Sequence, residues 1–346
     1  LLDLNPAGGV IISCEIGVDF ISVIATNFAA NVVWRHREEI PQIHTQQVAI
    51  AHLLDLLEKA IAISCDAYGR LLGIAVGVPG LVDQGSGTLF FAPNLDWKDI
   101  PLGQILRTTF NVPVFIDNEA NLAALGEHYF GAIQNHNEVL YVSVGIGLGG
   151  GIIRDGQLFN GATGFAGEFG HIVLDPNGQQ CKCGNRGCWE TFVNPAALFD
   201  YLHQALDQGQ ESLLTQQIEQ PEHLTIAQVA QAAQDGDAAA RSALGKIGYY
   251  LGLGIASLVN ALNPDLVVLG GPLGQAGPQL LPEINRVLEN RVLHWRRQAT
   301  PVVLAQHGSD ACVMGGMAMV YQAILANPSN GLSDLVSTSL PVANHH

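Results

Sequence analysis

The apolar segments of this 346-residue chain follow one order twice, and this repetition limits the folds that it can adopt. In the first part, three short apolar runs precede a helical stripe and a fully apolar run that Pro79-Gly80 ends. This order predicts a β-meander, an amphipathic helix and a buried parallel strand. The apolar runs are residues 10–16, 20–25, 32–34 and 72–78, and the stripe consists of Ile50, Leu53, Leu54, Leu57 and Ile61.

The second part repeats the pattern of strands and helices. The expected strands are 114–116, 138–144 and 266–269, and the expected helices are 119–130 and 238–262. A duplicated α/β fold in two lobes is therefore expected, with the border near Asn118. We expect residues 1–117 to form the first lobe, residues 118–326 the second lobe, and the Ser-, Asn- and Pro-rich residues 327–346 a flexible tail.

Charge and hydropathy exclude two classes of partner. No apolar run approaches the roughly 18 residues that a membrane span requires, so we expect no membrane contact. The formal net charge of -16 would repel a phosphate backbone, so the chain as printed should not bind DNA. The sequence begins Leu1-Leu2 and has no signal-peptide pattern, which predicts a trimmed piece of a cytoplasmic protein.

Three of the six cysteines crowd together near a histidine in the pattern H-x9-C-x-C-x4-C. One imidazole and three thiolates form a closed tetrahedral set for a structural zinc ion, and Gly184 and Gly187 allow the tight turns that such a loop needs. The alternative is a cluster of free or redox-active thiols. The expected ligands are His171, Cys181, Cys183 and Cys188, whereas Cys14, Cys65 and Cys312 are expected to be buried thiols.

Two further features lie close to this pattern in the sequence. Glu168 precedes His171 by three residues and Glu190 follows Cys188 by two, so a bound metal would also fix two carboxylates. Upstream, residues 145–151 include five glycines, which permit positive φ angles and close approach of the backbone to a ligand.

Several motifs resemble those of the ROK family of repressors and sugar kinases, in the order expected for that family. The resemblance covers roughly residues 10–325 and implies a two-lobed α/β fold of the actin-like ATPase or ribonuclease H-like type, with a β-meander plus αβα unit in each half. The motifs are Leu71 to Asp83, Ala92 to Trp97, Asp117-Asn118-Glu119-Ala120-Asn121, Gly167-Glu168-Phe169-Gly170-His171, Cys181 to Glu190 and Val268-Leu269-Gly270-Gly271.

The resemblance also implies a set of monosaccharide ligands. Carboxylates accept hydroxyl protons in strong hydrogen bonds, and an imidazole with one nitrogen on zinc keeps the other for the sugar. Taken alone, each of these residues could instead lie on the surface, and Asn118 could cap a helix. The implied sugar ligands are Asn118, Glu119, Glu168, His171 and Glu190, with Asn94 and the Gly80 backbone at the edge.

The phosphate-binding motifs of the family's kinases are altered in this chain. A D-x-G-G-T turn is replaced by Glu15-Ile16-Gly17-Val18-Asp19, which puts a branched side chain and a carboxylate where phosphate should approach backbone N–H groups. The second loop, G-T-G, is Gly145-Ile146-Gly147, and the catalytic Asp is replaced by the longer Glu119. We therefore expect no bound ATP and no kinase activity.

Together these features predict the sugar-binding and oligomerisation part of a ROK-family transcriptional repressor. DNA binding would require a winged helix-turn-helix domain upstream of Leu1, and a homodimer or homotetramer is expected. The main alternative is an ATP-dependent hexose kinase with an unusual phosphate loop, and a third is a scaffold that docks onto another protein. Xylose, glucose and N-acetylhexosamines all remain possible ligands.

Overall fold

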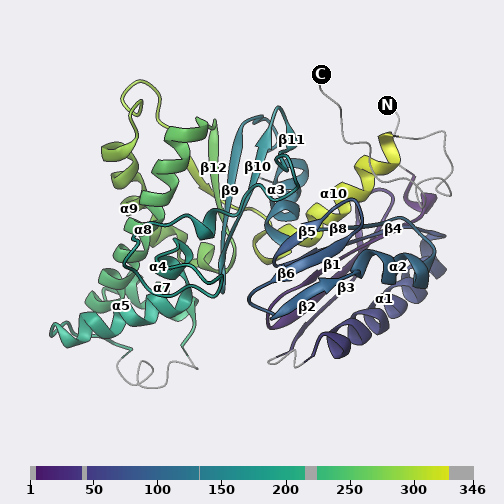
Figure 1. Ribbon diagram of the computed structural model, residues 1–346, viewed down its shortest axis with the longest axis horizontal. Coiled ribbons are helices and arrows are strands. Elements are labelled where there is room, and N and C mark those ends of the chain that lie inside the picture. The colour runs from purple at the N-terminus through teal and green to yellow at the C-terminus, as the bar shows by residue number, and fades with distance from the viewer. Residues whose placement is uncertain (1–4, 41–44, 132, 215–223, 327–346) are drawn as a thin grey trace. The chain divides into compact units, whose positions relative to one another are not determined.

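The computed structural model describes residues 5–40, 45–131, 133–214 and 224–326 (Figure 1). The predicted tail, 327–346, lies outside the described residues. The strands are β1 Val10–Ile16, β2 Phe20–Asn27, β3 Val32–Glu39, β4 Leu71–Val78, β5 Leu81–Asp83, β6 Thr88–Ala92, β7 Trp97–Ile100, β8 Val114–Asn118, β9 Val139–Val144, β10 Leu148–Arg154, β11 Gln157–Leu158, β12 Leu266–Gly270 and β13 Val302–Leu304.

The helices cover most of the other segments. The α-helices are α1 Gln46–Tyr68, α2 Leu102–Phe110, α3 Glu119–Phe130, α4 Glu190–Val193, α5 Pro195–Asp207, α7 Ile226–Gln234, α8 Ala238–Leu262, α9 Gly277–Arg291 and α10 Ala311–Ala326. Short 3-10 helices are η1 Pro6–Gly8, η2 Phe169–His171, η4 Pro272–Ala276 and η5 Gly308–Asp310. The predicted helices 119–130 and 238–262 are confirmed as α3 and α8.

The predicted duplication is confirmed by two sheets with the same topology. The first has the order β3-β2-β1-β4-β8, and the second has the order β11-β10-β9-β12-β13. In the first sheet, β1, β2 and β3 form an antiparallel meander, and β4 and β8 run parallel to β1. In the second sheet, β9, β10 and β11 form the antiparallel meander, and β12 and β13 run parallel to β9. A third, small sheet joins β5, β6 and β7.

Contacts within the chain define two compact units. Unit 1 comprises the described residues of Leu1–Phe130, Asn160–Ala166 and Asp310–His346, and unit 2 those of Gly131–Phe159 and Gly167–Ser309. This division differs from the border expected near Asn118, because α3 packs against α10 and both belong to unit 1. The two helices approach closely at glycines: a Cβ on Gly315 would lie 1.6 Å from the Leu122 carbonyl oxygen.

Unit 1 sandwiches its five-stranded sheet between helices. One face of β1 carries Ile12 and Cys14 into a core with Leu53 and Leu57 of α1, and the other face carries Ile11 toward α10. Strands β1, β4 and β8 are parallel, so Glu15, Gly77 and Asp117 lie side by side at their carboxyl ends. Such strand ends are where α/β folds place their ligands.

Unit 2 buries one face of its sheet under helices α5, α7, α8 and α9. By length and composition, Ala238–Leu262 and Gly308–Ala326 could each cross a membrane. However, 61% and 56% of their respective apolar 18-residue stretches are buried inside the fold. Both are therefore core helices, as expected for apolar helices that pack on a sheet.

Candidate functional site

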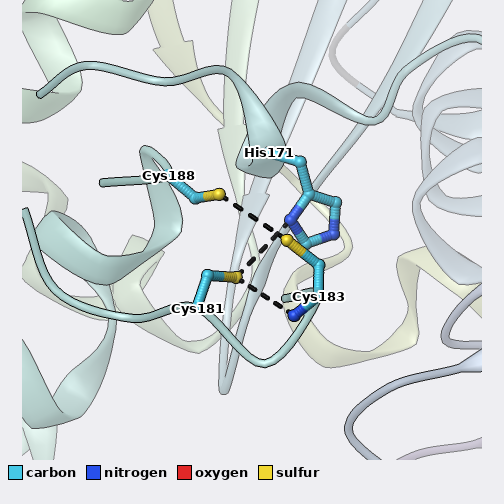
Figure 2. A group of neighbouring side chains, drawn as sticks. All are labelled: His171, Cys181, Cys183 and Cys188. Carbon is cyan, nitrogen blue, oxygen red and sulfur yellow. Dashed lines mark hydrogen bonds between the residues drawn. The ribbon is translucent and has the colours of Figure 1, made fainter. Parts of the chain in front are cut away.

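Four soft ligand atoms of unit 2 meet in one cluster, formed by His171 and the three cysteines of the H-x9-C-x-C-x4-C pattern (Figure 2). Their ligand atoms all lie within 4.8 Å of one another. The Cys181 Sγ is 3.8 Å from His171 Nδ1, and the Cys183 and Cys188 sulfurs are 3.7 Å apart. One imidazole nitrogen and three sulfurs at this spacing are consistent with the zinc site of the family that the sequence resembles.

The loop that carries these ligands turns at its two expected glycines. Gly184 and Gly187 have φ angles of 95° and 64°, and a Cβ on Gly187 would lie 1.5 Å from the Asp175 carbonyl oxygen. Hydrogen bonds from the Cys181 N–H to the Asn185 oxygen and from the Gly187 N–H to the Gln179 oxygen close the turns. Only glycine fits at position 187, because any side chain would overlap this backbone.

A buried tryptophan fixes the end of the loop. The side chain of Trp189 is fully buried, and the backbone N–H of this residue donates to the Ile172 carbonyl oxygen. Its ring lies against α8 at Gly254, where a Cβ would come within 2.2 Å of it. Because Cys188 and Glu190 flank Trp189 in the chain, this packing sets the positions of one cysteine of the cluster and one carboxylate together.

His171 has the cysteine cluster and the Glu190 carboxylate on the side of its Nδ1 and the Glu168 carboxylate on the side of its Nε2. Its Nδ1 faces Cys181, whereas its Nε2 lies 3.9 Å from an Oε2 of Glu168. Glu190 Oε1 accepts a hydrogen bond of 2.8 Å from the Cys181 thiol and lies 3.7 Å from His171 Nδ1. The structure therefore brings together three of the predicted sugar ligands, Glu168, His171 and Glu190, within unit 2.

Burial raises the pKa values of several groups in this site. Burial, reinforced by the Glu190 carboxylate, raises the pKa of the Cys181 thiol, and burial also raises that of Cys188. The pKa of Glu168 is raised by burial, against the opposing effect of His171. Buried thiols with raised pKa values are neutral unless a cation favours the thiolate.

The remaining predicted sugar ligands belong to unit 1. Asn118 ends β8, and its Nδ2 donates to the Gly80 carbonyl oxygen over 3.1 Å. Its Oδ1 accepts from the Ala120 N–H, so Asn118 also caps α3, as the alternative interpretation of this residue supposed. Glu119 is the first residue of α3, and Asn94 lies in the turn between β6 and β7. The structure thus joins Asn118 to Gly80.

Asp117 is a further polar centre that the sequence interpretation did not single out. Its side chain is 1% exposed and accepts hydrogen bonds from Gln84 Nε2 (2.6 Å), Asn121 Nδ2 (3.0 Å) and the Asn118 N–H (2.7 Å). Burial raises its pKa to about 6, although the three donors oppose this shift. The position of Asp117 at the end of a predicted buried strand is the sequence feature that could have identified it. No sequence feature indicated that Gln84 would contact it.

The first altered phosphate loop, in unit 1, is a closed hairpin turn. The Gly17 N–H donates to the Phe20 carbonyl oxygen over 2.8 Å. The Phe20 ring covers Gly17, since a Cβ there would lie 2.2 Å from it, and the Arg37 guanidinium lies 3.7 Å from the centre of the ring. Asp19 is exposed beside this turn, and burial raises the pKa of the preceding Glu15 carboxyl to about 7.

The second loop, in unit 2, corrects one expectation about glycine. The Gly145 N–H donates to the Gly147 oxygen, and the Ile146 side chain is 44% exposed. None of the glycines between 145 and 151 has a positive φ angle, and those after Leu148 lie in strand β10. Close approach explains Gly150 instead, where a Cβ would lie 2.1 Å from the Phe169 ring.

Comparison with known proteins places this geometry in a family. The model of the ROK family matches residues 11–323. A xylose repressor of Caldicellulosiruptor bescii is 36% identical over 328 residues, which cover 95% of this chain and 82% of that protein.

Two solved structures share the fold at 30% sequence identity. A ROK family transcriptional regulator, a homologue of the Escherichia coli MLC protein, has a TM-score of 0.82 and is matched over 96% of this chain and 80% of its own. A ROK family glucokinase from Streptomyces griseus, in complex with glucose and AMPPNP, has a TM-score of 0.80, with 91% and 100% covered. The two mixed α/β units are thus those of the actin-like ATPase fold of ROK sugar kinases. This chain belongs to the ROK family.

Proposed function

We propose that this chain is the sugar-binding part of a ROK-family transcriptional repressor, and that it does not phosphorylate its ligand. The observation that carries the proposal is the two-sided imidazole of His171, with Nδ1 on the cysteine cluster and Nε2 near Glu168. This arrangement gives a structural metal ion a direct role in orienting a sugar-binding group.

Zinc fits the donor set of the cluster. Three thiols and one imidazole are soft ligands that favour tetrahedral zinc, and they fill all four positions, so the ion would be structural. His171, Cys181, Cys183 and Cys188 would hold it. When bound, the zinc ion stabilises the thiolates and the fold of the loop. The chain's own groups, chiefly Glu168 and Glu190, then bind the ligand.

The proposed ligand is a monosaccharide. Neighbouring sugar hydroxyls can both donate to one carboxylate, and each such bond is charge-assisted. Glu168 and Glu190 of unit 2 would accept from hydroxyls, and His171 Nε2 would complete this group. From unit 1 the proposal adds the groups that the family resemblance implies: Asn118, Glu119, Asn94 and the Gly80 backbone.

The first phosphate loop supports the repressor over the kinase. The Gly17 N–H is occupied by the Phe20 oxygen, and the Phe20 ring covers the glycine on which a phosphate would rest. Asp19 adds a negative charge beside the loop, and Ile146 in the second loop offers no hydroxyl. A carboxylate near a triphosphate costs several kcal/mol in a partly desolvated site (roughly 332/εr). The similarity to a glucokinase keeps the hexose kinase as the alternative.

The negative charge of this chain indicates that another part of the proposed repressor binds DNA. A net charge of -16 opposes contact with phosphates, so the proposal gives this task to a basic winged helix-turn-helix segment outside the printed sequence. We also propose that the protein is cytoplasmic and forms a homodimer or homotetramer. A sugar would change DNA affinity only through unequal affinity for two arrangements of the protein.

Zinc content tests the metal cluster. The purified chain should contain about one zinc ion, and Cys183→Ser should lose it, because a closed site needs all four ligands. The variant should also unfold at lower temperature, and amide exchange should rise across residues 171–190. Cys65→Ser, at a partly buried thiol of α1, is the matched control and should keep its zinc. Equal zinc content in both variants would contradict the site.

Calorimetric titration with D-xylose, D-glucose and N-acetyl-D-glucosamine tests the ligand class. At least one of them should bind saturably, and Glu168→Gln should weaken that binding about tenfold to a hundredfold through loss of charge-assisted hydrogen bonds. Glu58→Gln, on the exposed side of α1, should bind like the wild type. The absence of saturable binding to the sugar panel, or equal losses in both variants, would count against the proposal.

Coupled measurement of ADP release separates the repressor from the kinase. With ATP and the same sugars, turnover should stay below about 1 per second, the lower end of the range for kinases. Val18→Gly combined with Asp19→Thr should not restore it, because Ile146 and Glu119 remain. Turnover above that rate in the wild type would establish the hexose kinase instead.

A further inference from the structure

A hydrogen-bonded turn between β5 and β6 presents Gln84 to the carboxyl end of β8. Asp83 fixes this turn, since its carboxylate accepts from the Gly85 N–H and from the N–H and hydroxyl of Ser86. The Gly87 N–H closes the turn on the Asp83 carbonyl oxygen. Gln84 then reaches Asp117 with an Nε2–Oδ2 distance of 2.6 Å. The turn is therefore built to hold one amide in place.

The hydrogen bonds of Gln84 form a row with a fixed direction. An ionised carboxylate only accepts, so Asp117 must receive the Gln84 amide nitrogen, and the Gln84 oxygen must face the other way. That oxygen accepts from Asn160 Nδ2 over 2.9 Å. On its other oxygen, Asp117 accepts from Asn121 and from the Asn118 N–H. Asp117 thus orients both amides and the backbone of Asn118.

Asn160 begins a short strap, residues 160–166, that belongs to unit 1 although the chain enters and leaves it from unit 2. The Ala166 N–H donates to the Asn160 carbonyl oxygen, which closes the strap into a loop. The strap packs through Phe165, whose ring meets that of Phe90 edge-on with centroids 6.2 Å apart. In the sequence, Glu168 follows two residues after Ala166.

We infer that Gln84 is a positioning residue of the proposed sugar site, which ties the Asp117–Asn118 turn and the strap together so that sugar binding depends on both. This inference rests on the proposed function, since Asn118 and Glu168 are among the proposed ligands. Gln84 itself need not touch the sugar. Its effect passes through Asp117 to the Asn118 backbone and through Asn160 to the strap.

Replacing the Gln84 amide by a carboxyl makes its hydrogen bond to Asp117 depend on pH. If Gln84 is a positioning residue, sugar binding by this variant should depend on pH in the same way. In Gln84→Glu, two carboxyls would lie where the amide and Asp117 now meet at 2.6 Å, so they must share a proton to keep the bond. Burial already raises the pKa of Asp117 to about 6, and a second carboxyl raises the pKa of the pair further. The row should therefore be intact at pH 6.0 and broken at pH 8.0.

Other titratable groups lie on neighbouring elements of unit 1 and are the same in every variant. Asp83 lies on β5, Glu119 begins α3, and Glu15 lies on β1. The Cys312 thiol at the start of α10 has its pKa raised by burial and by the carboxylates of Glu15, Glu119 and Asp117. Comparing each variant with the wild type at the same pH cancels their contribution.

The experiment is a calorimetric titration of the full chain with D-xylose, D-glucose and N-acetyl-D-glucosamine at pH 6.0 and 8.0. Relative to the wild type, Gln84→Glu should bind about tenfold to a hundredfold more weakly at pH 8.0 and within about threefold at pH 6.0. Gln84→Leu should be weakened by a similar factor at both pH values. Gln104→Glu and Gln104→Leu, at an exposed glutamine of α2, should match the wild type.

Amide hydrogen exchange adds an arm that needs no sugar. Gln84→Leu should raise exchange in residues 160–166, and Gln84→Glu should raise it at pH 8.0 but not at pH 6.0, each relative to the wild type. Wild-type binding with unchanged affinity in Gln84→Glu, or with a loss that pH does not relieve, overturns the inference alone. Failure of the wild type to bind any of the three sugars overturns the proposed function, and the inference with it.

Discussion

The loop over residues 171–190 brings one imidazole and three thiols together into a single cluster of soft donor atoms. Its turns are polar and glycine-rich, and backbone hydrogen bonds alone contribute little net stability. A metal bound by an imidazole and three thiolates would supply that stability directly. The same imidazole faces Glu168 with its second nitrogen, so one side chain links the cluster to a carboxylate that we propose as a sugar ligand.

Packing in unit 2 carries this constraint into the hydrophobic core. Trp189 is buried against α8 where Gly254 leaves room for its ring, and its neighbours in the chain are Cys188 and Glu190. A cysteine of the cluster, a buried tryptophan and a carboxylate are therefore consecutive residues, so the packing of Trp189 positions both of its neighbours. Unit 1 also contains a buried polar centre, the Asp117 carboxylate at the end of β8, which accepts hydrogen bonds from three donors. In both units a buried polar centre lies beside groups that we propose as sugar ligands.

Much of the fold could be predicted from the sequence because periodicity is a local property. The stripe around Leu53 and the apolar run of β4 predicted their elements, and the ligand spacing from His171 to Cys188 predicted the cluster. Contacts between distant segments could not be predicted in this way. The pairing of α3 with α10 moved the border of unit 1, and the bond from Gln84 to Asp117 joins residues 33 apart in the chain. The glycines after Leu148 were expected to permit positive φ angles, but they lie in strand β10, where Gly150 allows close packing of the Phe169 ring.

The most direct test of the account is a crystal structure of the chain with a bound monosaccharide, recorded at the zinc absorption edge. We expect an anomalous peak among His171 Nδ1 and the three cysteine sulfurs, with a sugar hydroxyl within hydrogen-bond distance of His171 Nε2 and of Glu168. A peak elsewhere, or a sugar bound away from that imidazole, would contradict it.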